Sequence, residues 1–466
     1  MERRAAHHCG GLSFHLVTVA NADYGASSQL RWDRIASIDL SNNNLTATIK
    51  LKEVCAPFFA TTIAGSGATT SGFMLPMHKF EGMQPAQIGK SDYGTQGSAG
   101  HVSSGPFKIE SWRKGEAIRL VRNDNYVGQK SCLDGLIFQV VPSVDAGTSA
   151  LQRGDVDLAT NYYASDIPTL KNLEGRGIKT LAYPAYLVER YVFNYNDPKD
   201  PNITVDPTKA RPHPVMSDAA VRRAISLGIN RPAIVEKLLY NNAKIAVNEW
   251  DNSPWFNTAI KPYPYDPEAA KKMLDDAGWV VGDGGIRAKG GVRLSFTHST
   301  TSGNPIRETI QRAAINDLRN IGIEMKILNH DPSKLFATFS EGGVLSRRNF
   351  DIGGYTTGIG LDPDFSSYYA CSQIPHKGAP AGSNFGGYCN PELDKLWAAQ
   401  AKEPDPAKRK AIYDQIQQVM YDDTPILWIY DRLQIDAAGP NFTAPKPDFT
   451  GYIWWAPEQM TLKGGQ

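Results

Sequence analysis

Two aspartates on either side of a proline, Asp362 and Asp364, have a type and spacing that could support chemistry. A pair of carboxylates can act as general acid and general base in hydrolysis. The segment around Pro363 has loop character, so the two side chains need not converge on one substrate. A hydrolase that uses these carboxylates is therefore an alternative for this chain, and the spacing by itself predicts no catalytic residue.

Signatures of other catalytic and cofactor sites are absent from the sequence. There is no Gly-x-Ser-x-Gly elbow, no P-loop, no Gly-x-Gly-x-x-Gly after a strand and no His-Glu-x-x-His pair. Cys-x-x-Cys pairs are also missing, which excludes zinc ribbons and thioredoxin-like redox motifs. We therefore predict a chain that is not an enzyme and that holds neither a cofactor nor a metal ion.

Five cysteines allow at most two disulfides, and one pair bounds a plausible local loop. The segment from Cys371 to Cys389 has little helical or strand character. A bridge between its ends would limit the freedom of the unfolded chain. We predict a disulfide between these two residues.

The composition speaks against nucleic acid as a partner. Lys and Arg number 49 and Asp and Glu number 48, which leaves a formal net charge of +1. This balance implies no basic face.

The sequence has no run of about 20 apolar residues that would predict a membrane span. Polar residues interrupt the segment 12–20 too often for a signal peptide. The 20 Tyr and 9 Trp fit a pocket for a polar organic ligand as well as an ordinary core.

The elements that would position these residues form an α/β pattern, and 466 residues are enough for more than one core. The first third is rich in strands. Residues 35–40 and 45–51 alternate around an Asn-rich turn, which predicts a β-hairpin. Further strands are expected at 107–109, 118–120 and 136–141, before a short helix over 146–153 that ends at Gly154.

Helices alternate with strands in the second half. Four helices are expected to begin at an Asp or Asn followed by proline, at residues 266, 304, 390 and 405. The helix from Pro305 has an apolar stripe and ends at Gly322. Strands at 292–297 and 323–328 flank it, which predicts a βαβ unit with parallel strands.

Several segments resemble one family, in its order. Residues 104–112 and 118–126 are similar to a signature of family 5 solute-binding proteins, the dipeptide, oligopeptide and nickel receptors of ABC importers. The further matching segments are 133–138, 150–158, 192–194, 221–231, 265–274, 278–279 and 390–396.

The resemblance implies a type II periplasmic-binding-protein fold, an α/β architecture whose two lobes close around a hinge. It places residues 61–184 and 441–466 in lobe one and residues 185–440 in lobe two. Residues 1–60 are then a leader and the remnant of a small extra domain. The family's signal peptide and first lobe-one segment have no counterpart, so the resemblance implies an N-terminally truncated member.

The implied function is that of the substrate-binding subunit of an ABC importer. Such a protein captures a peptide-like or other polar small-molecule solute and delivers it to permease subunits. The resemblance implies a monomer located in the periplasm or anchored outside the cytoplasmic membrane. A non-transporting sensor or chaperone-like binding module is a further alternative.

The resemblance also implies which residues bind the ligand. Tyr355 stands where the family has a pocket aromatic residue, and Trp250 and Trp255 lie in a segment that can cover the cleft. Gly358 stands where dipeptide receptors carry an aspartate for the peptide amine, so no free amine is expected to be anchored there. Some dipeptide receptors also have a disulfide similar to the predicted one. The predicted ligand-binding residues are Arg190, Tyr191, Asn194, Trp250, Trp255, Tyr355, Thr356, Thr357 and Asp362.

Overall fold

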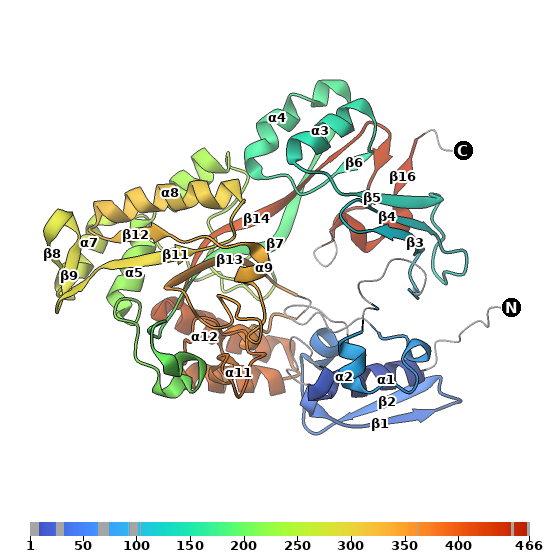
Figure 1. Cartoon of the computed structure of the whole chain (residues 1–466), viewed down its shortest axis with the longest axis horizontal. Coiled ribbons are helices and arrows are strands. Elements are labelled where there is room, and N and C mark those ends of the chain that lie inside the picture. Colours follow the sequence, from blue (N-terminus) through green and yellow to red (C-terminus); the bar gives the residue numbers. More distant parts are fainter. Residues whose placement is uncertain are drawn as a thin grey trace.

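The structure is a computed structural model, and its elements form three regions (Figure 1). An N-terminal unit contains α1, α2, β1 and β2; a second region contains α3, α4, β3 to β6 and β16; the largest contains α5, α7, α8, α11, α12 and β8 to β13. The long strands β7 and β14 join the second region to the largest. The described residues are 9–24, 32–63, 74–91, 93, 101–102, 104–360, 362–448 and 452–463.

The N-terminal unit is built on the predicted hairpin. Strands β1 (Ile35–Ser41) and β2 (Thr46–Leu51) pair antiparallel. Three asparagines with positive φ angles of 51°, 52° and 64° make the turn, a conformation that Asn tolerates better than most residues. Residues 1–8 of the predicted leader lie outside the described residues. Residues 9–20, for which the sequence suggests no element, form helix α1 (Cys9–Ala20), whose buried Leu16 packs against Trp32. Helix α2 is Pro85–Gly89.

The second region contains the predicted strands as β3 (Phe107–Arg113), β4 (Ala117–Arg122) and β5 (Gly135–Gln139), all antiparallel. The predicted short helix is α3 (Val144–Arg153), and Gly154 caps it in the left-handed conformation. The remaining elements are β6 (Leu158–Ala159), α4 (Ile167–Lys171), β15 (Phe442–Thr443) and β16 (Thr461–Leu462).

A six-stranded sheet runs through the molecule in the order β12-β11-β13-β7-β14-β6. Its other strands are β7 (Lys179–Phe193), β11 (Ser295–Ser299), β12 (Glu324–Ile327), β13 (Ile352–Gly358) and β14 (Ile426–Ala438). Strand β11 is parallel to β12, with helix α8 (Pro305–Asn320) between them in the chain, so the predicted βαβ unit is confirmed.

The predicted strand over 292–297 is wrong in its extent. Residues Val292–Arg293 form β10, which pairs with β9 (Arg287–Lys289) beside β8 (Val280–Val281) in a separate small sheet. The chain bends at Leu294, a fully buried residue, before β11 begins. Leu294 packs in the core beside α8, and local alternation of residue types does not reveal the bend.

All four predicted Asx–Pro helix starts are confirmed. The capping side chains accept backbone N–H bonds at the first turns of α7 (Pro267–Asp276), α8, α11 (Pro391–Lys402) and α12 (Pro406–Asp423). Helix α5 (Ala219–Gly228) buries Val221, Ala224 and Ile225. Three short helices complete the region: α6 (Arg231–Ala233), α9 (Pro332–Leu335) and α10 (Ser366–Tyr369).

Within the largest region, both faces of the six-stranded sheet are buried. One core contains residues of α5, α7 and α8 together with Tyr191 and Phe193 of β7. The other contains residues of α11 and α12 together with Val188 and Val192 of β7. Because side chains alternate along a strand, β7 contributes successive residues to two different environments.

Candidate ligand-binding site

Strand β7 separates two of the predicted ligand-binding residues. Tyr191 points into the α5–α8 core, where it is 4% exposed and its ring lies 4.1 Å from that of His298. Burial raises its pKa far above the usual tyrosine value. Arg190 points to the opposite face, directly across from Tyr355 in the β7–β13 register. The structure therefore brings Arg190 and Tyr355 together and places Tyr191 elsewhere.

Arg190 is the centre of a group that we call the arginine–tyrosine cluster: Arg190, Glu249, Tyr355, Tyr368 and Tyr369, all buried except the half-buried Tyr368. Its Nη1 donates to Glu249 Oε1 and to the Tyr369 hydroxyl, each at 2.7 Å. Its Nη2 donates to the Tyr355 hydroxyl at 3.2 Å. The guanidinium carbon also lies 4.8 Å from the ring centroid of Tyr355 and 5.0 Å from that of Tyr368.

The electrostatics of this cluster follow from its burial. Arg190 is 1% exposed and the Glu249 side chain is 0% exposed, so the pair has little access to water. Burial raises the pKa of Tyr355 to about 12, although the Arg190 charge opposes that shift. The Tyr355 phenol is therefore neutral near pH 7. Within the described residues, Arg190 Nε and Glu249 Oε2 have no hydrogen-bond partner.

Asn194 and Trp250 hold neighbouring segments in place. The Asn194 amide donates to the carbonyls of Arg348 and Phe350, just before β13. The Trp250 indole is fully buried and donates to the Pro363 carbonyl at 2.9 Å. These contacts fix the backbone before and after strand β13, which carries Tyr355.

The remaining predicted residues are not members of the arginine–tyrosine cluster. Asp362 accepts two bonds from the Arg409 guanidinium of α12, at 2.7 and 2.8 Å. Trp255 packs on the ring of Tyr413, with centroids 5.3 Å apart. Thr356 is half-buried, whereas Thr357 is buried and its hydroxyl has no partner among the described residues.

A cavity of about 1140 Å³ lies beside the arginine–tyrosine cluster. Its walls are residues 33–34 and 53–55, which flank the N-terminal hairpin, with the loop 336–346, the segment 366–385 and one face of α11. Phe336 and Phe385 line it, and their ring centroids lie 6.1 and 6.3 Å from that of Tyr355. Reasoning from the sequence missed both phenylalanines, because nothing local connects them to Tyr355.

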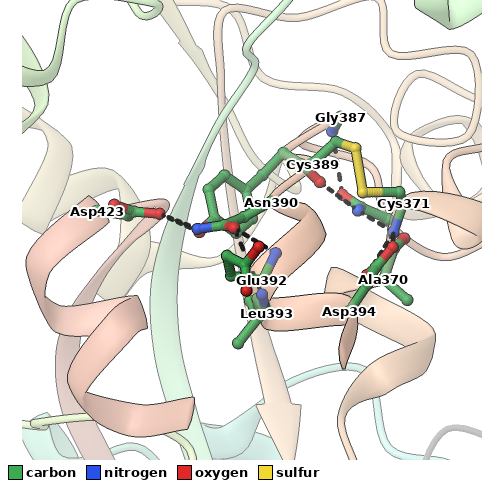
Figure 2. Close-up of a disulfide and its surroundings, with 11 residues drawn as sticks. Ala370, Cys371, Gly387, Cys389, Asn390, Glu392, Leu393, Asp394 and Asp423 are labelled. Carbon is green, nitrogen blue, oxygen red and sulfur yellow. Dashed lines mark hydrogen bonds between the residues drawn. A yellow bond between two sulfur atoms is a disulfide. The ribbon is translucent and has the colours of Figure 1, made fainter. Parts of the chain in front are cut away.

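A disulfide joins Cys371 to Cys389, the predicted pair, beside this cavity (Figure 2). It ties the segment 371–389 to the start of α11. The Cys371 amide donates to the carboxylate of Asp394, and Asn390 next to Cys389 donates to Asp423 at 2.8 Å. The wall of the cavity is thus covalently closed on one side.

Residues 16–376 match the family model of bacterial extracellular solute-binding proteins, family 5. The chain belongs to this family. Among family 5 relatives, it is 26% identical over 414 residues to the oligopeptide-binding protein AppA of Bacillus subtilis, covering 88% of this chain and 69% of AppA. It is 25% identical over 359 residues to the nickel-binding periplasmic protein of Escherichia coli, covering 75% of this chain and 62% of that protein. The chain thus spans about two thirds of the length of these relatives.

Solved structures of family 5 relatives share the two-lobed fold. NikZ from Campylobacter jejuni, in complex with Ni(L-His), superposes with a TM-score of 0.80 at 20% identity, covering 97% of this chain and 84% of NikZ. AppA from Bacillus subtilis, in complex with a nonapeptide, superposes with a TM-score of 0.79 at 24% identity, covering 98% and 83%. In the described part of this chain, no helix has the length and apolar character to span a membrane.

Proposed function

We propose that this family 5 protein is the substrate-binding subunit of an ABC importer, which captures a peptide-like or other polar organic solute and passes it to permease subunits. The observation that carries the proposal is the cavity of about 1140 Å³ beside the arginine–tyrosine cluster. Aromatic rings and small polar side chains line it, as in pockets for polar organic ligands. The relatives AppA and NikZ were captured with a nonapeptide and with Ni(L-His).

We place the ligand-dependent movement in the paired strands β7 and β14. Their register shifts between Trp428 and Tyr430 and again between Asp431 and Leu433. Pro184, which has no N–H to donate, lies opposite Leu433. Weaker pairing at this point favours bending of the ribbon there, so that the lobes can close on a solute and exclude water from it.

We assign no catalytic role to the two aspartates that suggest a hydrolase. Asp362 is tied to Arg409, and Asp364 Oδ2 accepts a bond from Gln400 at 2.8 Å. Both carboxylates hold the loop onto α11 and α12. A peptide and glycoside library incubated with the protein should show no turnover; turnover abolished by Asp362→Asn would favour the hydrolase instead.

We also propose a monomer outside the cytoplasm, where a disulfide such as Cys371–Cys389 persists. The decisive experiment is native mass spectrometry of the purified protein, followed by calorimetry with each co-purifying solute. A bound polar organic solute is expected. Uptake of that solute by vesicles containing the cognate permease separates an importer subunit from a non-transporting sensor.

A further inference from the structure

One face of helix α11 forms a wall of the cavity. Asp394, Trp397, Ala398, Ala401 and Lys402 all line it. Their spacings of three and four residues place them on the same side of the helix. The face carries one charged residue at each end, with an aromatic ring and two alanines between them.

Among the described residues that line the cavity, every charged side chain except one has an ion-pair partner. Glu53 accepts from both Arg34 and Lys402, the latter at 2.7 Å. Arg34 Nε also lies 3.8 Å from Asp33. The loop 336–346 and the segment 366–385 contribute no charged side chain to the lining. Asp394 is the remaining charged residue.

Asp394 has capacity for a further partner. Its two oxygens accept one backbone N–H, that of Cys371, at 3.1 and 3.4 Å (Figure 2). Within the described residues, no Lys, Arg or His forms an ion pair with it. A carboxylate can accept about four hydrogen bonds, so most of this capacity is unused. Burial raises its pKa, which a cation beside it would reverse.

The surroundings of Asp394 suit the stem of a basic side chain. Trp397, Phe385 and Phe336 present apolar rings to the same cavity. Methylene groups of Lys or Arg cover such surfaces while the charged end reaches a carboxylate. Aromatic faces also attract cations directly.

We propose that the cavity is a subsite for a basic group of the cargo, an ammonium or guanidinium, with Asp394 as its counter-ion. The inference rests on the proposed function, and it narrows the cargo to peptide-like solutes with a basic side chain. The anchor is distinct from Gly358, which offers no side chain, and from Asp362, which Arg409 already occupies.

Three blocked pentapeptide libraries test the proposal, each acetylated at the N-terminus and amidated at the C-terminus. The fixed central residue is Lys, Nε-acetyl-Lys or Glu. Calorimetry should show that the Lys library binds the wild-type protein about tenfold more tightly than the acetyl-Lys library. Asp394→Asn should reduce that ratio to about one. Glu392→Gln is the matched control, because it also removes a negative charge from the first turn of α11 but lies exposed beside Lys395; it should keep the ratio.

Carbodiimide labelling of Asp394 in the wild-type protein gives a readout that needs no variant. The Lys library should protect Asp394, and the acetyl-Lys library should not. Equal affinity for both libraries, or equal labelling, overturns the inference while the proposed function stands. Failure of every library to bind, together with the absence of any co-purified solute, overturns both.

Discussion

Arg190 carries a positive charge inside the protein, and its partners make that placement tolerable. Glu249 supplies the counter-charge, and the hydroxyls of Tyr355 and Tyr369 accept the other donated bonds. A buried ion pair contributes little compared with a well-packed apolar pair, but the loss of one partner is costly because the other charge stays buried.

Glu249→Gln should therefore lower the free energy of unfolding by about 3 kcal/mol, measured by urea denaturation. The control is Glu268→Gln, which removes an exposed pair with Lys271 and should cost less than about 1 kcal/mol. Similar small losses of free energy of unfolding in both variants would show that the buried Arg190–Glu249 pair is not important for stability.

Two further buried carboxylates predict a pH dependence of stability. Burial raises the pKa of Asp251 to about 7, and the charges of Asp431 and Glu249 add to this shift. Burial raises the pKa of Asp431 to about 6, and the charge of Lys244 opposes this shift. An aspartate in the unfolded chain has a pKa of about 4. The folded protein thus binds more protons than the unfolded chain between those values, so the free energy of unfolding falls as the pH rises through that window.

The expected loss between pH 5 and pH 7.5 is about 1–3 kcal/mol, measured by urea denaturation at both pH values. Asp251→Asn should flatten this dependence, because an amide does not titrate. The exposed variant Glu268→Gln should leave it unchanged. An Asp251→Asn protein with the wild-type slope would show that other groups cause it.

At the scale of elements, the segment 371–389 depends on a covalent closure and on a helix start. The disulfide spans 18 residues, and the Asn390 cap begins α11 directly after it. The bridge and the cap together fix the wall that carries Asp394.

Replacement of both Cys371 and Cys389 by serine should lower the free energy of unfolding by about 3 kcal/mol, because the open loop gains freedom in the unfolded chain. Thermal unfolding with and without reductant measures the effect, and the double variant should no longer respond to reductant. Peptide mapping that finds both residues as free thiols in exported protein would refute the disulfide.

At the scale of the whole molecule, the lobe boundaries at residues 184 and 440 stay a prediction. Ile435 and Ala437 of β14 pack with Leu151 and Leu170 of the second region. We therefore propose that the chain passes from lobe two back to lobe one inside β14 rather than at residue 440.

The N-terminal unit meets the largest region through Glu53. Its carboxylate pairs with Lys402 of α11, and the Ala56 amide donates to the Ala401 carbonyl at 2.7 Å. Glu53→Gln should change the free energy of unfolding by less than about 1 kcal/mol, since these pairs are partly exposed. It should nevertheless weaken the binding of a co-purified solute, because the cavity wall loosens. Asp33→Asn, which alters a residue on the same rim with a side chain 73% exposed, should change affinity less.

Elements whose signals are local can be predicted from the sequence. Asn304 followed by Pro305 starts α8 because one side chain satisfies a backbone N–H within three residues. The Asn-rich turn makes the β1–β2 hairpin because Asn tolerates the positive φ angles that the turn needs. The family resemblance predicted the two-lobed fold, and solved relatives share it.

Which side chains meet depends on how distant segments of the chain pack together. Arg190 and Glu249 are 59 residues apart, and Asp362 and Arg409 are 47 apart, so no local pattern links them. The pleat of β7 separates Arg190 from its neighbour Tyr191, which a family match treats alike. Helix caps and hairpin turns act within a few residues of chain, whereas a cavity forms where distant segments pack against each other. That is why Asp394 emerges as a candidate anchor from the folded protein and not from the sequence.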